Sequence, residues 1–289
     1  MSTSLLDPDF IRRLARLRLL VRRRFAGTAG GARRSTRRGA SVEFADHRAY
    51  SPGDDIRRID WNAYARLEEL VLRLFVAEED LTVYLMIDRS ASMAFGEPAK
   101  LEVAKRLAAA LAYIGLTGSE RVSVVPFGAG ADQPLPPTRG QRRVGHVLKY
   151  LDAIEPSGET SLRKTVDEFL ARRPRPGLVI VLGDLLDPDG WTRPLDRLLS
   201  EKHEPVLFHV LATEEVDPPA GGDFAFVDSE RGRRVEVSLD RRARQAYLAR
   251  LDAFLDSIQS YAKKRGLSYV QAFGELSLED ALMSYLRAG

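Results

Sequence analysis

The sequence predicts an α/β protein with a doubly wound, mostly parallel sheet, and two observations support this fold class. From Leu81 onward, short apolar segments alternate with segments of helical periodicity. The apolar segments are hydrophobic along their whole length, as in Leu178–Leu182, rather than alternating with polar residues. Such strands are typical of parallel sheets that helices cover on both faces.

The first apolar segment carries the principal candidate site. Residues 81–87 are apolar or β-branched and predict a buried strand that is too short to span a membrane. Asp88 follows directly, and Ser90 and Ser92 come next at alternate positions. In open α/β sheets, ligands bind at the carboxyl ends of strands. Carboxylate and hydroxyl oxygens suit Mg²⁺ or Mn²⁺ better than Zn²⁺.

The chain is expected to have three parts. Residues 1–38 read as a basic amphipathic helix with a linker, residues 39–80 as a β-rich extension, and residues 81–289 as the α/β domain. Residues 224–237 read as a β-hairpin inserted into that domain, because two β-type segments flank a glycine-containing turn.

The predicted N-terminal helix carries a strong charge asymmetry. Residues 10–42 hold eleven arginines and no acid, so the rest of the chain has a net charge of −8 beside +3 for the whole. An apolar stripe of Phe10, Leu14, Leu17 and Val21 favours a helix docked on its own domain. The alternative is binding of nucleic acid or an anionic surface through the arginines, with a steep dependence on salt.

Within the α/β domain, the pattern predicts further elements in order. Helices are expected at about 98–116, 141–154, 160–172, 188–201, 241–265 and 277–286, and strands at 121–127, 178–182, 205–211 and 268–273. In the extension, strands are expected at 41–44 and 70–76.

Three loops are therefore expected at one edge of the sheet. Asp88, Ser90 and Ser92 lie on the first loop, Thr160 begins a helix after the second, and Asp184 directly follows a strand. Two carboxylates and three hydroxyls would suit a six-coordinate Mg²⁺ that keeps an open position. Taken singly, Thr160 would be a helix N-cap, and Asp187 competes with Asp184 for its role.

These five residues resemble the metal-ion-dependent adhesion site of von Willebrand factor type A domains. The matching pattern is Asp88-x-Ser90-x-Ser92, followed by Thr160 and Asp184. The resemblance implies a Rossmann-type fold and a Mg²⁺ or Mn²⁺ ion at these residues, with Asp184 acting through water. It also implies that a carboxylate of a partner protein completes the coordination of the metal.

A second block resembles the signature of domain-of-unknown-function family 58 (DUF family 58). It runs from Arg48 through Pro52-Gly53-Asp54-Asp55 to Trp61 and Arg66. The chain is similar to a short, soluble branch of that family, without preceding transmembrane helices. The resemblance implies an adaptor or co-chaperone of a MoxR-type AAA+ ATPase. The block is either an ion-pair network that pins the extension or a recognition surface formed by Arg48, Tyr50, Asp54, Asp55, Arg57, Arg58, Asp60, Trp61 and Arg66.

The functional hypothesis is a non-enzymatic, metal-dependent protein-binding adaptor in the cytoplasm, with no small-molecule substrate evident. The absence of cysteine excludes disulfides, thiolate metal sites and a cysteine nucleophile, and it fits a reducing compartment. The sequence has no nucleophile elbow, phosphate-binding P-loop or dinucleotide-binding fingerprint. A metal-assisted hydrolase remains the weaker alternative, because a bound Mg²⁺ can act as a Lewis acid.

Overall fold

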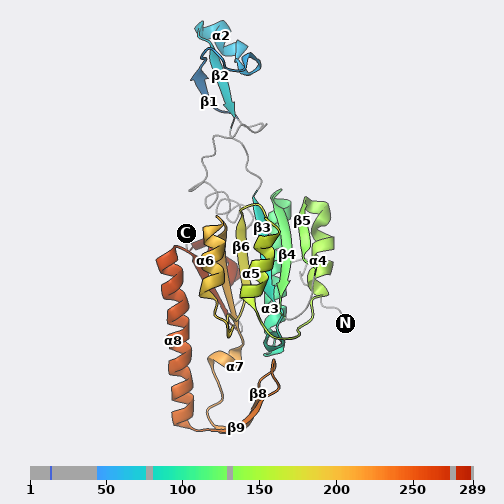
Figure 1. Cartoon of the computed structure of the whole chain (residues 1–289), viewed down its shortest axis with the longest axis vertical. Helices are drawn as coiled ribbons and strands as arrows, with labels where there is room; N and C mark the ends of the chain where they lie inside the picture. Colours follow the sequence, from blue (N-terminus) through green and yellow to red (C-terminus); the bar gives the residue numbers. More distant parts are fainter. Residues whose placement is uncertain (1–13, 15–43, 76–80, 129–132, 274–277, 288–289) are drawn as a thin grey trace. The chain divides into compact units, whose positions relative to one another are not determined.

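The computed structural model describes residue 14 and residues 44–75, 81–128, 133–273 and 278–287 (Figure 1). The chain divides into two compact units. One contains residues 1–29 and 81–289, and the other contains residues 30–80. Each unit is described by itself.

The larger unit is built on a six-stranded sheet. Its strands are β3 (Thr82–Asp88), β4 (Arg121–Phe127), β5 (Leu135–Arg139), β6 (Leu178–Gly183), β7 (Glu204–Leu211) and β10 (Ser268–Phe273). Their order across the sheet is β10-β7-β6-β3-β4-β5, and all neighbours are parallel except the edge strand β5, which runs antiparallel to β4. The predicted mixed α/β fold with a mostly parallel sheet is confirmed.

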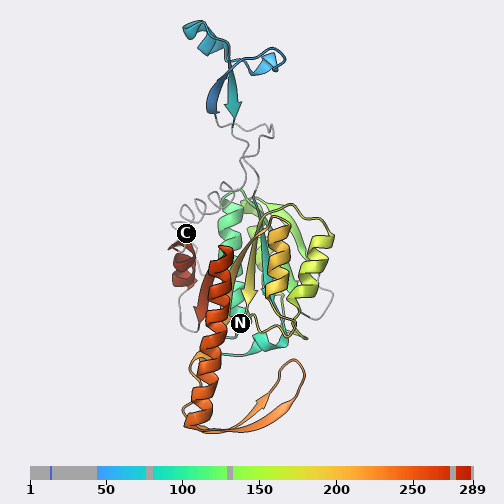
Figure 2. The same ribbon diagram turned by 60° about the vertical axis from the view of Figure 1, so that its left-hand side comes forward.

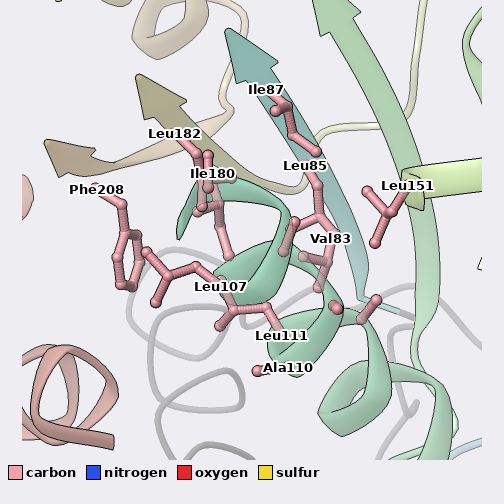
Figure 3. Close-up of a cluster of buried hydrophobic side chains, with 14 of the residues drawn as sticks. Val83, Leu85, Ile87, Leu107, Ala110, Leu111, Leu151, Ile180, Leu182 and Phe208 are labelled. Atoms are coloured by element: carbon pink, nitrogen blue, oxygen red, sulfur yellow. The ribbon is translucent and has the colours of Figure 1, made fainter. Parts of the chain in front are cut away.

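Helices cover both faces of this sheet. Side chains of α3 (Lys100–Thr117), α4 (Val144–Asp152) and α9 (Leu278–Arg287) pack in one apolar cluster, and those of α5 (Leu162–Ala171), α6 (Thr192–Ser200) and α8 (Arg241–Arg265) pack in another. Alternate residues of β3 pack in the two clusters: Val83 and Leu85 belong to the first, and Tyr84 and Met86 belong to the second. Figure 3 shows the first cluster between α3 and the sheet. Every residue of β3 is buried, which explains its continuous hydrophobic sequence.

The strand order places a topological switch point between β3 and β6. From β3 the chain moves to β4 and β5 on one side, then returns across the sheet to β6 on the other. At such a point, the loops that follow the two strands diverge and leave a crevice at their carboxyl ends. Asp88 ends β3, and Asp184 directly follows β6, so both carboxylates lie at this crevice.

A β-hairpin interrupts the alternation of strands and helices, as predicted. It consists of β8 (Gly222–Val227) and β9 (Arg234–Leu239), which pair antiparallel from end to end. The chain then enters α8, where the side chain of Asp240 accepts a hydrogen bond from the backbone N–H of Ala243. Figures 1 and 2 both show the hairpin curving back beneath the end of the sheet where β3 and β6 finish.

Several predicted boundaries differ from the structure. The helix expected from about residue 98 begins at Lys100, after the short helix η2 (Ala91–Ala94). The helix expected at 141–154 is η3 (Gln141–Arg143) followed by α4, and the one expected at 188–201 is shortened to α6. A four-residue helix, α7 (Thr213–Val216), follows β7 and was not predicted.

The smaller unit is a two-stranded antiparallel sheet of β1 (Phe44–Ala49) and β2 (Val71–Phe75). Between them lie the short helix η1 (Ile56–Arg58) and helix α2 (Trp61–Leu67). The first strand begins where the predicted one, at 41–44, was expected to end, and residues 41–43 lie outside the described residues.

Most of the predicted N-terminal helix and the arginine-rich segment also lie outside the described residues. Leu14 is described; it is helical, fully buried, and part of the cluster that α3 forms with the sheet. Among the helices in the described residues, none is both long and apolar enough to cross a bilayer.

Candidate metal centre

Asp88 lies at the centre of the candidate site. Its carboxylate is buried and accepts one hydrogen bond from the backbone N–H of Ser90 (2.9 Å to Oδ1) and one from the hydroxyl of Thr160 (3.2 Å to Oδ2). Gly183, at the end of the neighbouring strand β6, makes room for this side chain. A Cβ atom at Gly183 would lie 2.6 Å from the Cβ of Asp88, closer than such atoms approach.

The two serines connect Asp88 with Asp184. The Ser92 hydroxyl donates to Asp184 Oδ2 at 3.0 Å, and its oxygen lies 2.9 Å from the Ser90 hydroxyl oxygen. Because the single hydroxyl hydrogen of Ser92 is used on Asp184, Ser90 is the donor in the serine–serine bond. The oxygens of the first loop and of Asp184 therefore form one continuous hydrogen-bonded group.

Thr160 reaches this group because its loop is hydrogen-bonded to the first loop. The backbone N–H of Ser157 donates to the carbonyl of Arg89 (2.7 Å), and that of Ala91 donates to the carbonyl of Gly158 (2.9 Å). The prediction that Thr160 caps the following helix is wrong. Ser161 is the N-cap of α5 and accepts from the backbone N–H of Lys164, while the Thr160 hydroxyl donates to Asp88.

Asp184 is held in place by several neighbours. Its Oδ1 accepts from the backbone N–H of Leu186 at 3.0 Å, and its backbone carbonyl accepts from His209 Nε2 at 2.9 Å. Asp187, the competing candidate, instead accepts from the backbone N–H of Leu162 at 2.8 Å and so holds the start of α5. The geometry therefore favours Asp184 as the carboxylate that faces the serines.

His209 fixes the position of Asp184, and the sequence analysis did not single it out. A carbonyl oxygen can only accept, so Nε2 carries the proton and Nδ1 accepts from the hydroxyl of Tyr269 at 2.9 Å. Burial lowers the pKa of His209 to about 4. The ring is therefore neutral near pH 7 and acts as a fixed hydrogen-bonding support behind the loop.

A buried lysine beside Asp184 is the second feature that the sequence analysis missed. The Lys100 ammonium lies 2.8 Å from Asp184 Oδ2 and 2.7 Å from Glu215 Oε1, and the side chain is 1% exposed. Burial acts to lower the pKa of Lys100, but the charges of Asp184 and Glu215 outweigh it and raise that pKa. The available signal was a lysine in the first turn of the alanine- and leucine-rich helix α3, beside the candidate loop.

The site carries more negative than positive charge. Lys100 neutralises one of its two carboxylate partners, whereas the donors to Asp88 are the neutral groups of Ser90 and Thr160. Burial, together with repulsion from Asp184, raises the pKa of Asp88 to about 7. A divalent cation would relieve this excess charge, since an ion near a carboxylate favours its ionised form.

The donor set therefore fits a hard cation. The structure brings all five predicted residues together, with two carboxylates and three hydroxyls as oxygen donors. Among the described residues, no group of three or more histidine, cysteine or acidic side chains could hold a metal by itself. A metal here would consequently depend on the hydroxyls of Ser90, Ser92 and Thr160 as well as on the two aspartates.

The residues predicted as a possible docking surface lie in the smaller unit, and several of them stabilise its turns. Arg48 forms an ion pair with Asp54 at 2.7 Å, and the side chain of Asp55 caps η1. Asp60 caps α2 by accepting from the backbone N–H groups of Asn62 and Ala63.

Other members of that set are exposed on the smaller unit. The Trp61 side chain is 60% exposed and meets Tyr64 edge to face, with ring centroids 6.2 Å apart. Arg57 and Arg66 are also exposed, while Tyr50 is partly buried. Arg58 lies in η1, and its side chain is outside what the structure describes. Within its own unit, Trp61 is therefore not a buried packing residue.

Comparison with known proteins gives matches of two kinds. The chain is 31% identical over 247 residues to uncharacterized proteins of Mycobacterium bovis and Mycobacterium tuberculosis, covering 83% of this chain and 77% of each relative. Among solved structures, it is similar to the conserved hypothetical protein BatB from Bacteroides thetaiotaomicron, with 20% identity, a TM-score of 0.48, and coverage of 72% of this chain and 98% of that one. An aerotolerance-related membrane protein from Bacteroides fragilis matches with 18% identity, a TM-score of 0.44, and coverage of 72% and 100%.

The family match extends over most of the chain. Residues 46–253 match the family described as "Protein of unknown function DUF58". The matched region begins in β1 of the smaller unit and ends within α8, so it includes the signature block, all five candidate ligands and the hairpin. The chain belongs to the DUF58 family.

Proposed function

We propose that this protein is a metal-dependent protein-binding adaptor built on a von Willebrand factor type A-like domain. Asp88, Ser90, Ser92, Thr160 and Asp184 would hold a Mg²⁺ or Mn²⁺ ion. The observation that carries the proposal is the convergence of these five side chains, from three separate loops, at the switch point of the sheet. When bound, the ion would supply an electrophilic position that a carboxylate of a partner protein can occupy.

The residues around the five candidate ligands support a binding role. Lys100 and His209 are both buried; the first donates to the carboxylate of Asp184 and the second to its backbone carbonyl. Partners of this kind orient metal ligands and typically change metal affinity by about 10- to 100-fold when they are removed. Asp184 is thus held by buried partners, while the Ser92 and Thr160 hydroxyls donate to Asp184 and Asp88.

The partner proposed for this adaptor is a MoxR-type AAA+ ATPase or a client of that ATPase. This part of the proposal comes from the resemblance of the sequence to its family. It requires binding of the two proteins to depend on Mg²⁺ and on the five ligands. The arginine-rich N-terminal segment, the basis of the nucleic-acid alternative, lies outside the described residues and adds no observation in favour of that alternative.

A pull-down with the MoxR-type ATPase of the same organism tests the proposal, in Mg²⁺ and in EDTA. Asp88→Ala and Thr160→Ala should each abolish the Mg²⁺-dependent binding. Thr117→Ala is the matched control, because the Thr117 hydroxyl bonds to carbonyls of its own helix at the other end of α3. Retention of Mg²⁺-dependent binding by both site variants would refute the proposed mechanism.

A further inference from the structure

The inserted hairpin Gly222–Leu239 ends in a well-defined turn. In the hairpin tip, residues 228–233, the Asp228 side chain accepts from the backbone N–H groups of Glu230 (2.9 Å) and Arg231 (3.0 Å). The backbone N–H of Gly232 donates to the carbonyl of Asp228 at 2.7 Å, and that of Asp228 donates to the carbonyl of Arg233 at 2.8 Å. These bonds fix the direction in which the side chains of Glu230 and Arg231 leave the tip.

Both side chains point toward the loop that carries Thr160. Glu230 Oε2 lies 3.4 Å from the backbone nitrogen of Thr160, which donates to it, and Arg231 Nε lies 3.4 Å from Glu159 Oε1. The two contacts are to successive residues of the loop that carries a candidate ligand. Figures 1 and 2 show the hairpin beneath this end of the sheet.

Glu230 differs from its neighbours in the tip. Asp228, Ser229 and Arg231 are exposed, whereas Glu230 is partly buried. Its carboxylate contacts the backbone N–H of Thr160, whose hydroxyl in turn donates to Asp88. The Glu230 carboxylate therefore contacts the backbone of one candidate ligand, Thr160.

The position of Glu230 has an electrostatic cost that a cation would remove. It places a third carboxylate beside the loop of Thr160, whose hydroxyl bonds to the buried Asp88. The backbone N–H of Thr160 and the Arg231–Glu159 ion pair offset part of the repulsion between these carboxylates. With a Mg²⁺ ion in the oxygen group, the attraction of each carboxylate to the ion would outweigh the repulsion between the carboxylates.

We propose that Glu230 is an internal ligand of this metal centre, and that the hairpin Gly222–Leu239 covers the coordination position that a partner's carboxylate takes. The inference rests on the proposed function, and it defines the partner further. The partner must present an acidic side chain on a segment able to displace the hairpin tip. Metal binding and partner binding are thereby coupled to the position of the hairpin.

The number of water molecules on a bound Mn²⁺ ion tests this inference in the full-length protein. Water-proton relaxation measures the waters coordinated to Mn²⁺, and calorimetry measures the affinity. In Glu230→Gln, the affinity should fall by about tenfold, and each bound Mn²⁺ should carry one additional water, because a carboxylate ligand is lost. Glu236→Gln is the control, because it removes the same charge from an exposed position of β9.

The outcomes separate this inference from the proposed function. If Mn²⁺ binding depends on Asp88 but its affinity and hydration are the same in Glu230→Gln and Glu236→Gln, Glu230 is not a ligand, while the proposed metal centre stands. Mn²⁺ that fails to bind the wild-type protein, or binds Asp88→Ala equally well, would overturn both. An affinity loss and an added water in Glu230→Gln alone would support the inference.

Discussion

Replacing Lys100 by methionine tests how strongly the buried charges of the site depend on one another. Methionine is of similar length but carries no charge. The substitution leaves Asp184, which is fully buried, and Glu215, whose side chain is 18% exposed, without the ammonium that now lies 2.8 and 2.7 Å from them. Removing one partner of a buried ion pair costs about 3–5 kcal/mol, because a charge is left buried and uncompensated.

Urea unfolding followed by tryptophan fluorescence measures this cost. The chain has two tryptophans, so a Trp61→Phe background leaves buried Trp191 as the reporter of the α/β unit. Lys100→Met should lower the unfolding midpoint with an unchanged slope. Arg163→Met is the matched control: the Arg163–Asp189 pair is about half exposed on both sides and should contribute under about 1 kcal/mol.

A double substitution separates charge from packing in this prediction. Glu215→Gln in the Lys100→Met background removes one of the uncompensated carboxylates and should recover part of the lost free energy of unfolding. A loss below about 1 kcal/mol in Lys100→Met, equal to that in the exposed control, would refute the reasoning that Lys100 neutralises the site.

Three further predictions concern the metal centre, each with its own measurement. Gly183→Ala places a Cβ 2.6 Å from that of Asp88, so the Mg²⁺ affinity measured by calorimetry should fall and the free energy of unfolding should drop by about 1–3 kcal/mol. Gly145→Ala, whose added Cβ meets no atom within 4 Å, should leave the affinity unchanged; equal affinities in the two variants would contradict the steric argument. Thr160→Val should weaken Mg²⁺ binding by about tenfold. Ser161→Ala removes the cap of α5 and should lower only the free energy of unfolding, by about 1 kcal/mol; the reverse pattern would mean that Thr160 is the cap. Because burial and Asp184 raise the pKa of Asp88 to about 7, the folded protein holds a proton that the unfolded chain loses near pH 4, so the metal-free protein should lose stability as pH rises through this window. Mg²⁺ needs the carboxylate, so its affinity should fall by about tenfold per unit below pH 7, and calorimetry that found equal affinity at pH 6 and pH 8 would count against the raised pKa.

The fold was largely predictable because its signals are local. The fully buried strands β3 and β6 are almost wholly apolar. The long helix α8 is capped by Asp240 and ends before Gly266, whose positive φ gives a left-handed conformation. The hairpin followed from its turn residues. Element ends were less accurate, since the choice between Thr160 and Ser161 as the cap depends on a tertiary contact with Asp88.

The supporting residues of the site were not predictable in the same way. Lys100, His209 and Glu215 lie 25 or more residues from the residues they bond to, and their roles arise from the fold that brings them together. A lysine at the start of a helix ordinarily extends into solvent. Glu230 looked like one charged residue of a polar turn, and its partial burial depends on how the hairpin curves back toward the Thr160 loop.

Calorimetric titration of Mg²⁺ and Mn²⁺ into the wild-type protein and into Asp88→Ala tests the central claim most directly. Asp88 connects the Ser90 and Thr160 loops, and its substitution removes one of the two aspartates proposed as ligands. We predict saturable binding of one ion to the wild-type protein and no binding to Asp88→Ala. Equal binding to both proteins, or binding to neither, would contradict a metal centre at these five residues.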